Sequence, residues 1–384
     1  FKSIVINMND GVLISEADTS GLPAPKIIYI NNAFSKITGY TLEELAGKSL
    51  QILRGPKTDP ETVKKIDNAF FEGLPFEAEI VNYHKDGTEY WIELNSVPVK
   101  DAKGFSVYWI SIQRDITDRK KAEEEIRRLY KRIRESINYA KRIQQSILPG
   151  MQLIRKYFPH SFILFKPKDV VSGDFTWFYK KNDDYFIAAV DCTGHGVPGA
   201  FMSIIGNDLL NEIVIDKNID DPAKILDFLK EGINRSLHQS ELDAQSDDGL
   251  EIAFCRINLN KKQIVFSGSH RPLYFIHNGK LTQYKGDLVL IGGKPIKKEN
   301  LKFSNHTINF SKNDAIFLFS DGLQDQFSEN GESKYGSKRL RENLLNNLHL
   351  TMNELYNFFD NDFEQWKGSR NQIDDVLLIG IRFS

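Results

Sequence analysis

Hydrophobic and polar positions follow three different patterns along this chain, and each pattern predicts a different kind of structure. Up to about residue 117, short alternating apolar runs are separated by turn signals such as His84-Lys-Asp-Gly-Thr88. Residues 118–149 are mostly charged, with apolar residues at helical spacing. From residue 156 onward, apolar strand-like runs return in groups, separated by helical blocks. The pattern therefore predicts three parts, over residues 1–117, 118–149 and 150–384.

The first part is predicted to be a small α+β domain. A capping box at Thr41-Leu-Glu-Glu44 indicates the start of a short helix, because its two polar ends satisfy each other's backbone N–H groups. The turn at 84–88 predicts a hairpin between two strands. The expected elements are strands at 27–30, 77–83, 90–99 and 105–114 and a helical turn at 31–40.

The second part is predicted to be one helix with a narrow apolar stripe. Its apolar or small residues recur at alternating steps of three and four, at Ala122, Ile126, Leu129, Ile133, Ser136, Ala140, Ile143 and Ile147. Such a stripe is buried either on the same helix of a second chain or on its own domain. We expect a parallel coiled-coil homodimer, with Pro149-Gly150 ending the helix.

The third part alternates runs of strands with pairs of helices. Strands are predicted at 161–166, 185–190, 251–259, 263–267, 272–277, 315–320 and 376–383, and helices at 197–215, 222–238, 337–348 and 352–367. Strands in runs, with helices between the runs, predict two antiparallel sheets with helices outside them. We therefore expect an αββα sandwich, and an α+β class for the whole chain.

Composition narrows the range of partners. The chain has 384 residues, 41% of them hydrophobic, and a net charge of −2, which gives no reason to expect nucleic acid as a partner. Cys192 and Cys255 lie in apolar sequence, as expected of core residues in a reducing compartment. No apolar run reaches about 18 residues, and no secretory signal is visible at Phe1. We expect a cytoplasmic protein with no membrane segment in this chain.

Acidic residues at strand ends are the candidate chemistry of the third part. They are Asp174, Asp191, Asp321 and the pair Asp374-Asp375. One such acid usually caps a turn, but four in the same context are expected to meet if the strands lie side by side. Close carboxylates repel unless cations neutralise them, and Mg²⁺ or Mn²⁺ prefers such oxygen ligands.

The turn Asp191-Cys-Thr-Gly-His-Gly196 has two interpretations. It is either a tight strand-to-helix turn capped by its acid, or one wall of a metal site. An imidazole can protonate a leaving group, but we favour a structural role for His195. The acidic loop Ser246-Asp-Asp-Gly249 either borders the same cleft or is solvated.

The first part resembles PAS domains, and among them the LOV flavin photosensors. The resemblance rests on 31–40, 55–59, 82–91 and 112–117. In the photoreactive segment, here 47–55, Leu50 replaces the adduct-forming cysteine, Ser49 the flavin-facing asparagine and Gln51 the phosphate-contacting arginine. Ile92 replaces a strand asparagine, whereas Asn82 and Gln113 match. We expect a ligand-free, dimerising PAS domain, with flavin binding as the alternative.

The remainder resembles the metal-dependent protein phosphatases of the PPM family (type 2C), in their SpoIIE/RsbU-like branch. Ser172-Gly-Asp-Phe175, Asp191 to Gly196, Ser320-Asp-Gly322 and Asp374-Asp-Val376 follow the order of the family's motifs. Ile143-Gln-Gln-Ser-Ile-Leu-Pro149 resembles the Ile-Gln-x-x-Leu-Leu-Pro signature that precedes the catalytic domain.

This second resemblance implies roles for individual residues. Asp191 would bridge two Mn²⁺ or Mg²⁺ ions, the carbonyl of Cys192 and Asp174 would serve one of them, and Asp321 and Asp374 the other. Asp191 and Asp174 would be the catalytic acids, and a metal-bridged water would attack a phosphoserine or phosphothreonine. Lys166 and Lys168 are weaker candidates for binding the phosphate.

The resemblance also implies a partner, a phosphorylated STAS-domain protein that antagonises an anti-sigma factor. The predicted function is thus that of a sensor-regulated serine/threonine protein phosphatase, dimeric through its PAS domain and helical linker. The alternatives are a non-catalytic PAS-dimer signalling scaffold, in which the third part only binds phosphoprotein, and a flavin-based receptor module.

Overall fold

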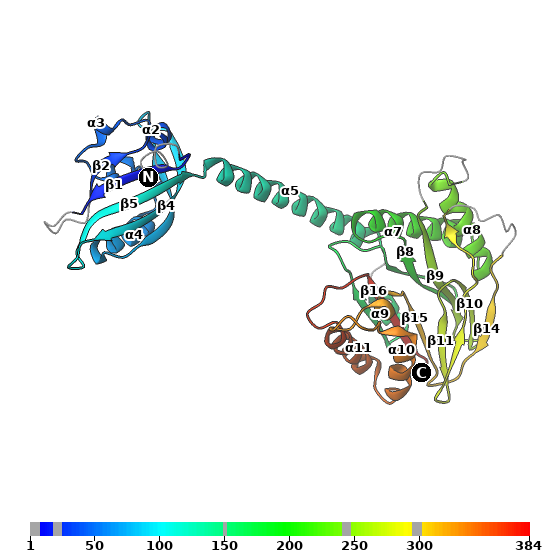
Figure 1. Cartoon of the computed structure of the whole chain (residues 1–384). Helices are drawn as coiled ribbons and strands as arrows, with labels where there is room; N and C mark the ends of the chain where they lie inside the picture. The colour runs from blue at the N-terminus through cyan, green and yellow to red at the C-terminus, as the bar shows by residue number, and fades with distance from the viewer. Residues whose placement is uncertain (1–7, 18–24, 149–151, 240–246, 294–301) are drawn as a thin grey trace. The chain divides into compact units, whose positions relative to one another are not determined.

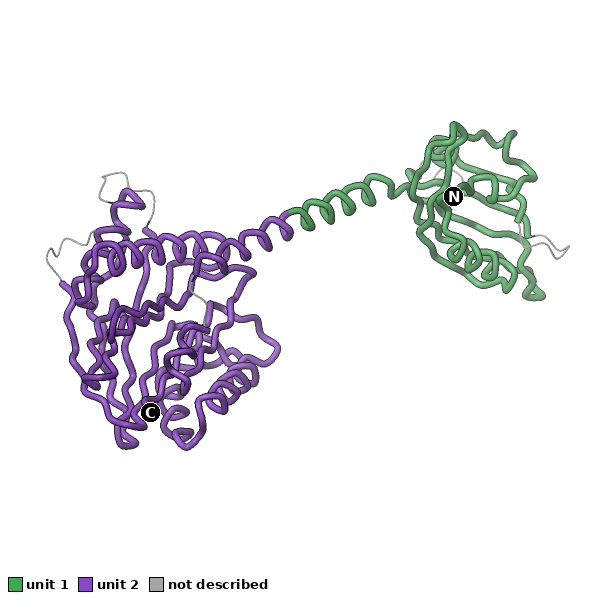
Figure 2. The backbone as a smooth tube through the Cα atoms, turned by 180° about the vertical axis from the view of Figure 1, so that it is seen from behind, with its two compact units in different colours: residues 1–132 green, residues 133–384 purple. Residues whose placement is uncertain are grey.

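The computed structural model describes residues 8–17, 25–148, 152–239, 247–293 and 302–384. The chain forms two compact units, residues 1–132 and 133–384 (Figure 2). Helix α5 (Thr117–Ile147) contributes residues to both units. Within the described ranges, no helix is long and apolar enough to cross a membrane.

The first unit is built on a five-stranded antiparallel sheet in the order β2-β1-β5-β4-β3 (Figure 1). Its strands are β1 (Gly11–Glu16), β2 (Lys26–Ile30), β3 (Phe76–Tyr83), β4 (Glu89–Lys100) and β5 (Ser106–Asp115). Its helices are α2 (Asn32–Thr38), α3 (Leu42–Leu45), α4 (Pro60–Glu72) and the 3₁₀ turn η1 (Leu50–Leu53). The predicted capping box of α3 is present, whereas β1 and α4 were not predicted.

Two apolar clusters hold this unit together. In the first, Phe34 of α2 and Leu45 of α3 pack with Leu13 of β1. In the second, Ile66 of α4 packs with the buried Ile92 of β4. The helices thus cover one face of the sheet and bury its alternate side chains.

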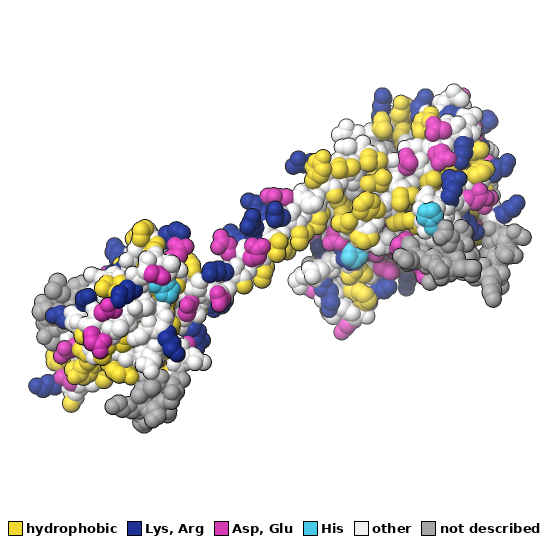
Figure 3. Space-filling view, turned by 90° about the horizontal axis from the view of Figure 1, so that it is seen from above, with side chains coloured by type: hydrophobic (Ala, Val, Ile, Leu, Met, Phe, Trp, Pro, Cys, Tyr) yellow, Lys and Arg dark blue, Asp and Glu magenta, His cyan; other side chains and the backbone are white. Residues whose placement is uncertain are grey.

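Helix α5 exposes the apolar stripe that its sequence predicts. Figure 3 shows apolar side chains (yellow) spaced along this helix between charged ones. The exposed apolar residues of the stripe are Ile126, Leu129, Ile133, Ile143 and Ile147. The predicted helix stop at Pro149-Gly150 lies outside the described residues. Nothing in this single chain tests the coiled-coil homodimer, which stays a prediction.

The second unit contains two antiparallel sheets. One has the order β14-β10-β9-β8-β7, with β13 added beside β9, and the other the order β12-β11-β15-β16-β6. The strands of the first are β7 (Phe175–Lys181), β8 (Asp184–Cys192), β9 (Gly249–Asn258), β10 (Gln263–Ser269), β13 (Ile291–Gly292) and β14 (His306–Asn309). The strands of the second are β6 (Ser161–Lys166), β11 (Leu273–His277), β12 (Lys280–Tyr284), β15 (Ala315–Phe319) and β16 (Val376–Arg382).

Helices cover the outer face of each sheet. They are α7 (Gly196–Asn211), the π-helical turn η2 (Glu212–Asp216), α8 (Pro222–Ser236), α9 (Gly322–Asp325), α10 (Gly336–Asn346) and α11 (Met352–Lys367). The short helix α6 (Gln152–Tyr157) instead places Ile154 in the apolar cluster between the two sheets. Leu210 and Leu226 of α7 and α8 pack on the first sheet, and Leu344 and Phe359 of α10 and α11 pack on the second.

A third apolar cluster fills the space between the two sheets. It includes Ile187 and Phe266 from the first sheet and Leu318 and Ile379 from the second. Because two helical layers enclose two packed sheets, the predicted αββα sandwich and the α+β class are confirmed (Figure 1).

The prediction missed β7, β12, β13 and β14 in this unit. The omission of β7 matters most, because Asp174 comes directly before that strand, whereas Asp191 lies near the end of β8. Pairing of β7 with β8 sets Phe175 opposite Val190, one residue from each of these two acids. A single added strand thus explains why the two carboxylates meet.

Candidate functional site

Four carboxylates from the two sheets converge at one end of the sandwich. Asp191 is the penultimate residue of β8 and lies beside the start of β7, where Asp174 sits. Asp321 follows β15, and Asp374 precedes the neighbouring β16. The Asp321 backbone N–H donates a 3.4 Å hydrogen bond to Asp191 Oδ2, which joins the two sheets. Asp191, Asp321 and Asp374 line a common cleft, which Thr193 and Gly194 also border.

Glycines bring the backbone of the Asp191 turn close to its neighbours. A Cβ atom on Gly199 of α7 would lie 2.2 Å from the Gly194 carbonyl oxygen, and one on Gly173 would lie 2.7 Å from the same atom. Such distances leave no room for a side chain, so Gly173 and Gly199 let the turn, α7 and the Asp174 loop pack together.

Asp375 has a structural position beside this cluster. Its Oδ1 accepts a 2.7 Å hydrogen bond from the Lys168 N–H, and its Oδ2 accepts a 2.8 Å hydrogen bond from the Gly173 N–H. The side chain is buried and ties β16 to the loop that carries Asp174. Asp374, by contrast, faces the cleft with one oxygen accepting the Asp375 N–H at 2.8 Å.

Burial makes ionisation of these carboxyl groups unfavourable. Burial, followed by the charge of Asp191, raises the pKa of Asp174 well above its usual value, and its Oδ2 has no partner among the described residues. Burial also raises the pKa of Asp191 to about 7, although Arg271 opposes the shift. The pKa of Asp374 is raised by burial as well. Carboxylates in this state are stabilised by nearby positive charge.

Arg271 supplies such a charge and was not foreseen in the sequence. Its Nη2 lies 3.0 Å from Asp191 Oδ2, 2.6 Å from Asp321 Oδ2 and 2.6 Å from Glu251 Oε2. Burial opposes the charge of the guanidinium, but the carboxylates of Asp191, Asp321 and Glu251 outweigh burial and raise the pKa of Arg271. Only the sandwich brings the β10–β11 turn to this end of β8, so no local sequence signal marks the residue.

The carboxylates of this cluster are suitable ligands for divalent cations, although two of them, Asp191 and Asp321, contact Arg271 in this structure. Within the described residues, no three His, Cys, Asp or Glu side chains are placed to hold a metal ion as they stand. A bound cation would compensate both the unpartnered Oδ2 of Asp174 and the raised pKa values of Asp174 and Asp191. Hard carboxylate oxygens are the ligands that Mg²⁺ and Mn²⁺ prefer.

The other candidates lie in different surroundings. His195 precedes α7, half-exposed, with its Nδ1 2.7 Å from Asp169 Oδ2. Lys166 pairs with Asp360 at 2.6 Å and Glu364 at 2.7 Å, so its charge is already neutralised. Of the acidic loop at 246–249, Asp247 lines the cleft, and Ser246 lies outside the described residues. The Cys192 thiol is buried, which raises its pKa well above the usual value.

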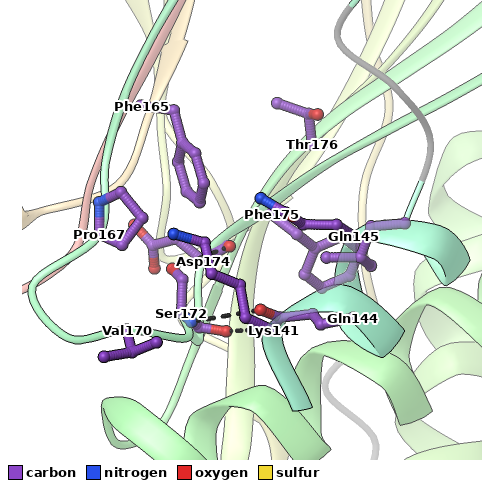
Figure 4. Close-up of a pocket in the computed structure, with 11 residues that line it drawn as sticks. Lys141, Gln144, Gln145, Phe165, Pro167, Val170, Ser172, Asp174, Phe175 and Thr176 are labelled. Atoms are coloured by element: carbon purple, nitrogen blue, oxygen red, sulfur yellow. Dashed lines mark hydrogen bonds between the residues drawn. The ribbon is translucent and has the colours of Figure 1, made fainter. Parts of the chain in front are cut away.

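The end of helix α5 contacts the Asp174 loop directly. The buried Gln144 side chain donates from Nε2 to the Ser172 carbonyl oxygen at 2.6 Å (Figure 4). The same nitrogen donates to Ser203 Oγ at 2.8 Å. Ser203 belongs to α7, so Gln144 joins the Asp174 loop to the helix that follows the Asp191 turn. A cavity of about 300 Å³ beside it is lined by α5 residues and by Asp174.

Polar atoms inside the first unit lack partners. Gln113 of β5 is buried, and neither its amide nitrogen nor its amide oxygen has a hydrogen-bond partner among the described residues. The buried Tyr90 hydroxyl is in the same state. Asn82 is buried nearby in β3, and Ile92 is buried in β4. These polar atoms would be satisfied by a bound molecule that carries both donors and acceptors.

Family models match both units. The model described as "Stage II sporulation protein E (SpoIIE)" matches residues 181–384, which is more than half of the chain. The chain belongs to the SpoIIE family. A PAS-domain model matches residues 9–118, so a PAS domain precedes the SpoIIE domain, as predicted. Asp191, Asp321 and Asp374 lie inside the SpoIIE match, and Asp174 lies just before it.

Similar proteins extend this picture. The SiaA-PP2C domain of Pseudomonas aeruginosa is 29% identical, with a TM-score of 0.59, and the match covers 67% of this chain and 99% of that domain. The SpoIIE domain is thus of the PP2C phosphatase type. A blue-light-activated histidine kinase of Brucella anthropi is 40% identical over 96 residues, or 25% of this chain. A bacterioopsin transcriptional activator of Halobacterium salinarum is 33% identical over 116 residues, or 30% of this chain. The matches span only 20% and 17% of these two proteins, respectively.

Proposed function

We propose that this chain is a PAS-regulated, divalent-metal-dependent serine/threonine protein phosphatase. The observation that carries the proposal is the convergence of Asp174, Asp191, Asp321 and Asp374 at the paired ends of two sheets in a SpoIIE domain. Phosphoryl esters are negatively charged, and a cleft of buried acids can accept one only with additional positive charge.

The chain's own residues would act as follows. Asp191 would hold both ions, with Asp174 and the Cys192 carbonyl as further ligands of one ion and Asp321 and Asp374 as further ligands of the other. When bound, the ions would acidify a water molecule and screen the charge of the phosphoryl group. Asp375 would keep Asp174 in position through the hydrogen bond from Gly173.

Gln144 would couple the sensor to this site. Its side chain holds the Ser172 carbonyl oxygen, two residues before Asp174, and Ser203 of α7. A change in the position of α5 would therefore move the loop of Asp174 relative to the Asp191 turn. The exposed stripe of α5 supports the further proposal that two chains pair along this helix and through their PAS domains.

The proposed substrate is a phosphorylated STAS-domain protein, as the resemblance to the SpoIIE/RsbU-like branch implies. The test is to incubate the full chain and Mn²⁺ with a panel of phosphorylated STAS-domain proteins and to measure released phosphate. We expect release from at least one of them, and none by the Asp321→Asn variant. Phosphoprotein binding without release at saturating Mn²⁺ would contradict the proposal and favour a non-catalytic scaffold.

The unpartnered amide of Gln113 favours a second possibility for the PAS domain, the binding of a flavin. The substitutions at Leu50 and Ser49 oppose it, because they remove the reactive thiol and a flavin-facing amide. Absorbance of the purified full chain in the blue region separates the two cases. We expect no flavin band; a band that remains after gel filtration would establish a flavin-based receptor.

A further inference from the structure

Arg271 occupies the centre of the acidic cluster. Each of its three ion pairs uses the same atom, Nη2, which contacts Asp191, Asp321 and Glu251 at 2.6–3.0 Å. Its Nε is also buried, yet it has no partner among the described residues. Among the described residues that line the cleft, Arg271 is the single Lys or Arg.

Two of the three carboxylates on Arg271 are proposed metal ligands. A guanidinium remains charged under all ordinary conditions, so it neutralises these carboxylates in the way that a bound cation would. Asp191 Oδ2 and Asp321 Oδ2 each lie within hydrogen-bond distance of Nη2, and an ion bound through the same oxygens would meet a positive charge there. The guanidinium and the ions therefore exclude each other from this oxygen set.

We propose that Arg271 is an internal cation that competes with the metal ions for Asp191 and Asp321 and must leave them before the site is complete. The inference rests on the proposed metal-dependent function. The contacts of Nη2 hold the Arg271 side chain in the acidic cluster. Its Nε makes no hydrogen bond with a described residue that would fix the rest of the guanidinium group. The side chain can therefore turn away by giving up the contacts of one nitrogen.

The alternative is that Arg271 has a structural role and stays in place when metal binds. In that case Arg271 would keep Asp191 and Asp321 aligned while the ions are bound, and its removal would weaken metal binding. The two roles thus predict changes of opposite sign in the affinity for metal, which makes them separable without any assay of turnover.

The experiment is calorimetric titration of Mn²⁺ into the full chain, comparing wild type, Arg271→Gln and Arg339→Gln. The control arginine, Arg339 of α10, pairs with Asp362 of α11, outside the acidic cluster. We expect Arg271→Gln to bind Mn²⁺ about tenfold more tightly, since couplings of this kind typically amount to roughly 5–150-fold. The metal-free variant should also melt at a lower temperature, because its carboxylates lose their counter-charge.

An affinity of Arg271→Gln that equals or falls below that of wild type would overturn the proposal. If wild type binds Mn²⁺ in that case, the proposed function stands and only the role of Arg271 is wrong. If no protein binds Mn²⁺, both proposals fail. Should the variant not fold, a crystal structure of the wild-type chain grown with Mn²⁺ decides the question. We expect Nη2 to lie away from Asp191 and Asp321; retained contacts with both would contradict the inference.

Discussion

Individual carboxylates carry the chemistry proposed for this chain, and the same carboxylates weaken the metal-free fold. Asp174 is almost completely buried, and its Oδ2 is without a partner among the described residues. The positive charge of Arg271 only partly offsets the effect of burial on the pKa of Asp191. A buried charge is usually paired, and the proposed metal ions would supply the missing counter-charge.

Asp191 should make the stability of the metal-free chain depend on pH. Its pKa is about 7 in the folded chain and about 3.9 in the unfolded chain. Between these values the folded chain binds more protons, so stability falls as the pH rises from about 4 to 7. Thermal melts in a chelator should therefore show a smaller loss of melting temperature across this window for Asp191→Asn than for wild type.

The control for this measurement is Asp183→Asn, because Asp183 is exposed in the turn between β7 and β8, away from the acidic cluster. Its melting temperatures should show the same pH dependence as those of wild type. Equal pH dependence for Asp191→Asn and wild type would mean that Asp191 is not buried as an unfavourable charge.

The sequence marks the acids well and their surroundings poorly. Asp174, Asp191, Asp321 and Asp374 could be predicted because each adjoins an apolar strand and a turn. Arg271 could not, because the ion pairs that distinguish it form only in three dimensions. The same holds for Asp375, whose oxygens are used by two distant backbone N–H groups.

Among the helices and strands, α5 is the element whose sequence signature corresponds to a direct contact with the candidate site. Its last turns carry the buried Gln144, while most of its remaining length is exposed. The Ile-Gln signature was thus a useful signal, because one polar residue in it makes three contacts with the Asp174 loop and α7.

Gln144→Ala should loosen this connection. The Ser172 carbonyl oxygen and Ser203 hydroxyl lose their buried partner, which costs about 1–3 kcal/mol of unfolding free energy. We expect reduced phosphate release together with a lower urea midpoint. Gln145→Ala, an exposed neighbour, is the matched control and should leave both quantities unchanged. Equal behaviour of the two variants would remove Gln144 from the proposed coupling.

Ile133→Asp should prevent pairing of two α5 helices. The side chain is 59% exposed in the single chain, and a coiled-coil partner would bury it. Light scattering should report a dimer for wild type and a larger monomer fraction for this variant. Lys131→Asp places the same charge outside the stripe and should remain dimeric. A wild-type monomer at micromolar concentration, or a dimeric Ile133→Asp, would rule out the seam.

Strands and helices were predictable where their patterns are strong. The strand at 161–166 and the helix at 352–367 have the predicted bounds. Short strands such as β12, with mostly exposed polar residues, give no apolar pattern to detect. The sequence does not identify the partner of the α5 stripe either. An apolar stripe predicts that another surface covers it, but it does not specify which surface.

For the whole molecule, a PAS domain and a SpoIIE domain share one helix, and the paired sheets of the SpoIIE domain create the site. Each sheet contributes two acids near its end, so the cluster exists only when both sheets are packed. The proposed site therefore depends on the stability of the sandwich. Because its acids come from different strands of both sheets, no single sequence motif specifies the function.

The most direct test of the central proposal is phosphate release from a phosphoserine substrate by the purified full chain, with and without metal. Activity should disappear in a chelator, return on addition of Mn²⁺ and fall by about 10²–10³-fold in Asp191→Asn, since metal assistance contributes several kcal/mol. Circular dichroism of the variant provides the control for folding. Wild-type activity that persists after all bound metal has been removed, as verified by elemental analysis, would contradict the account.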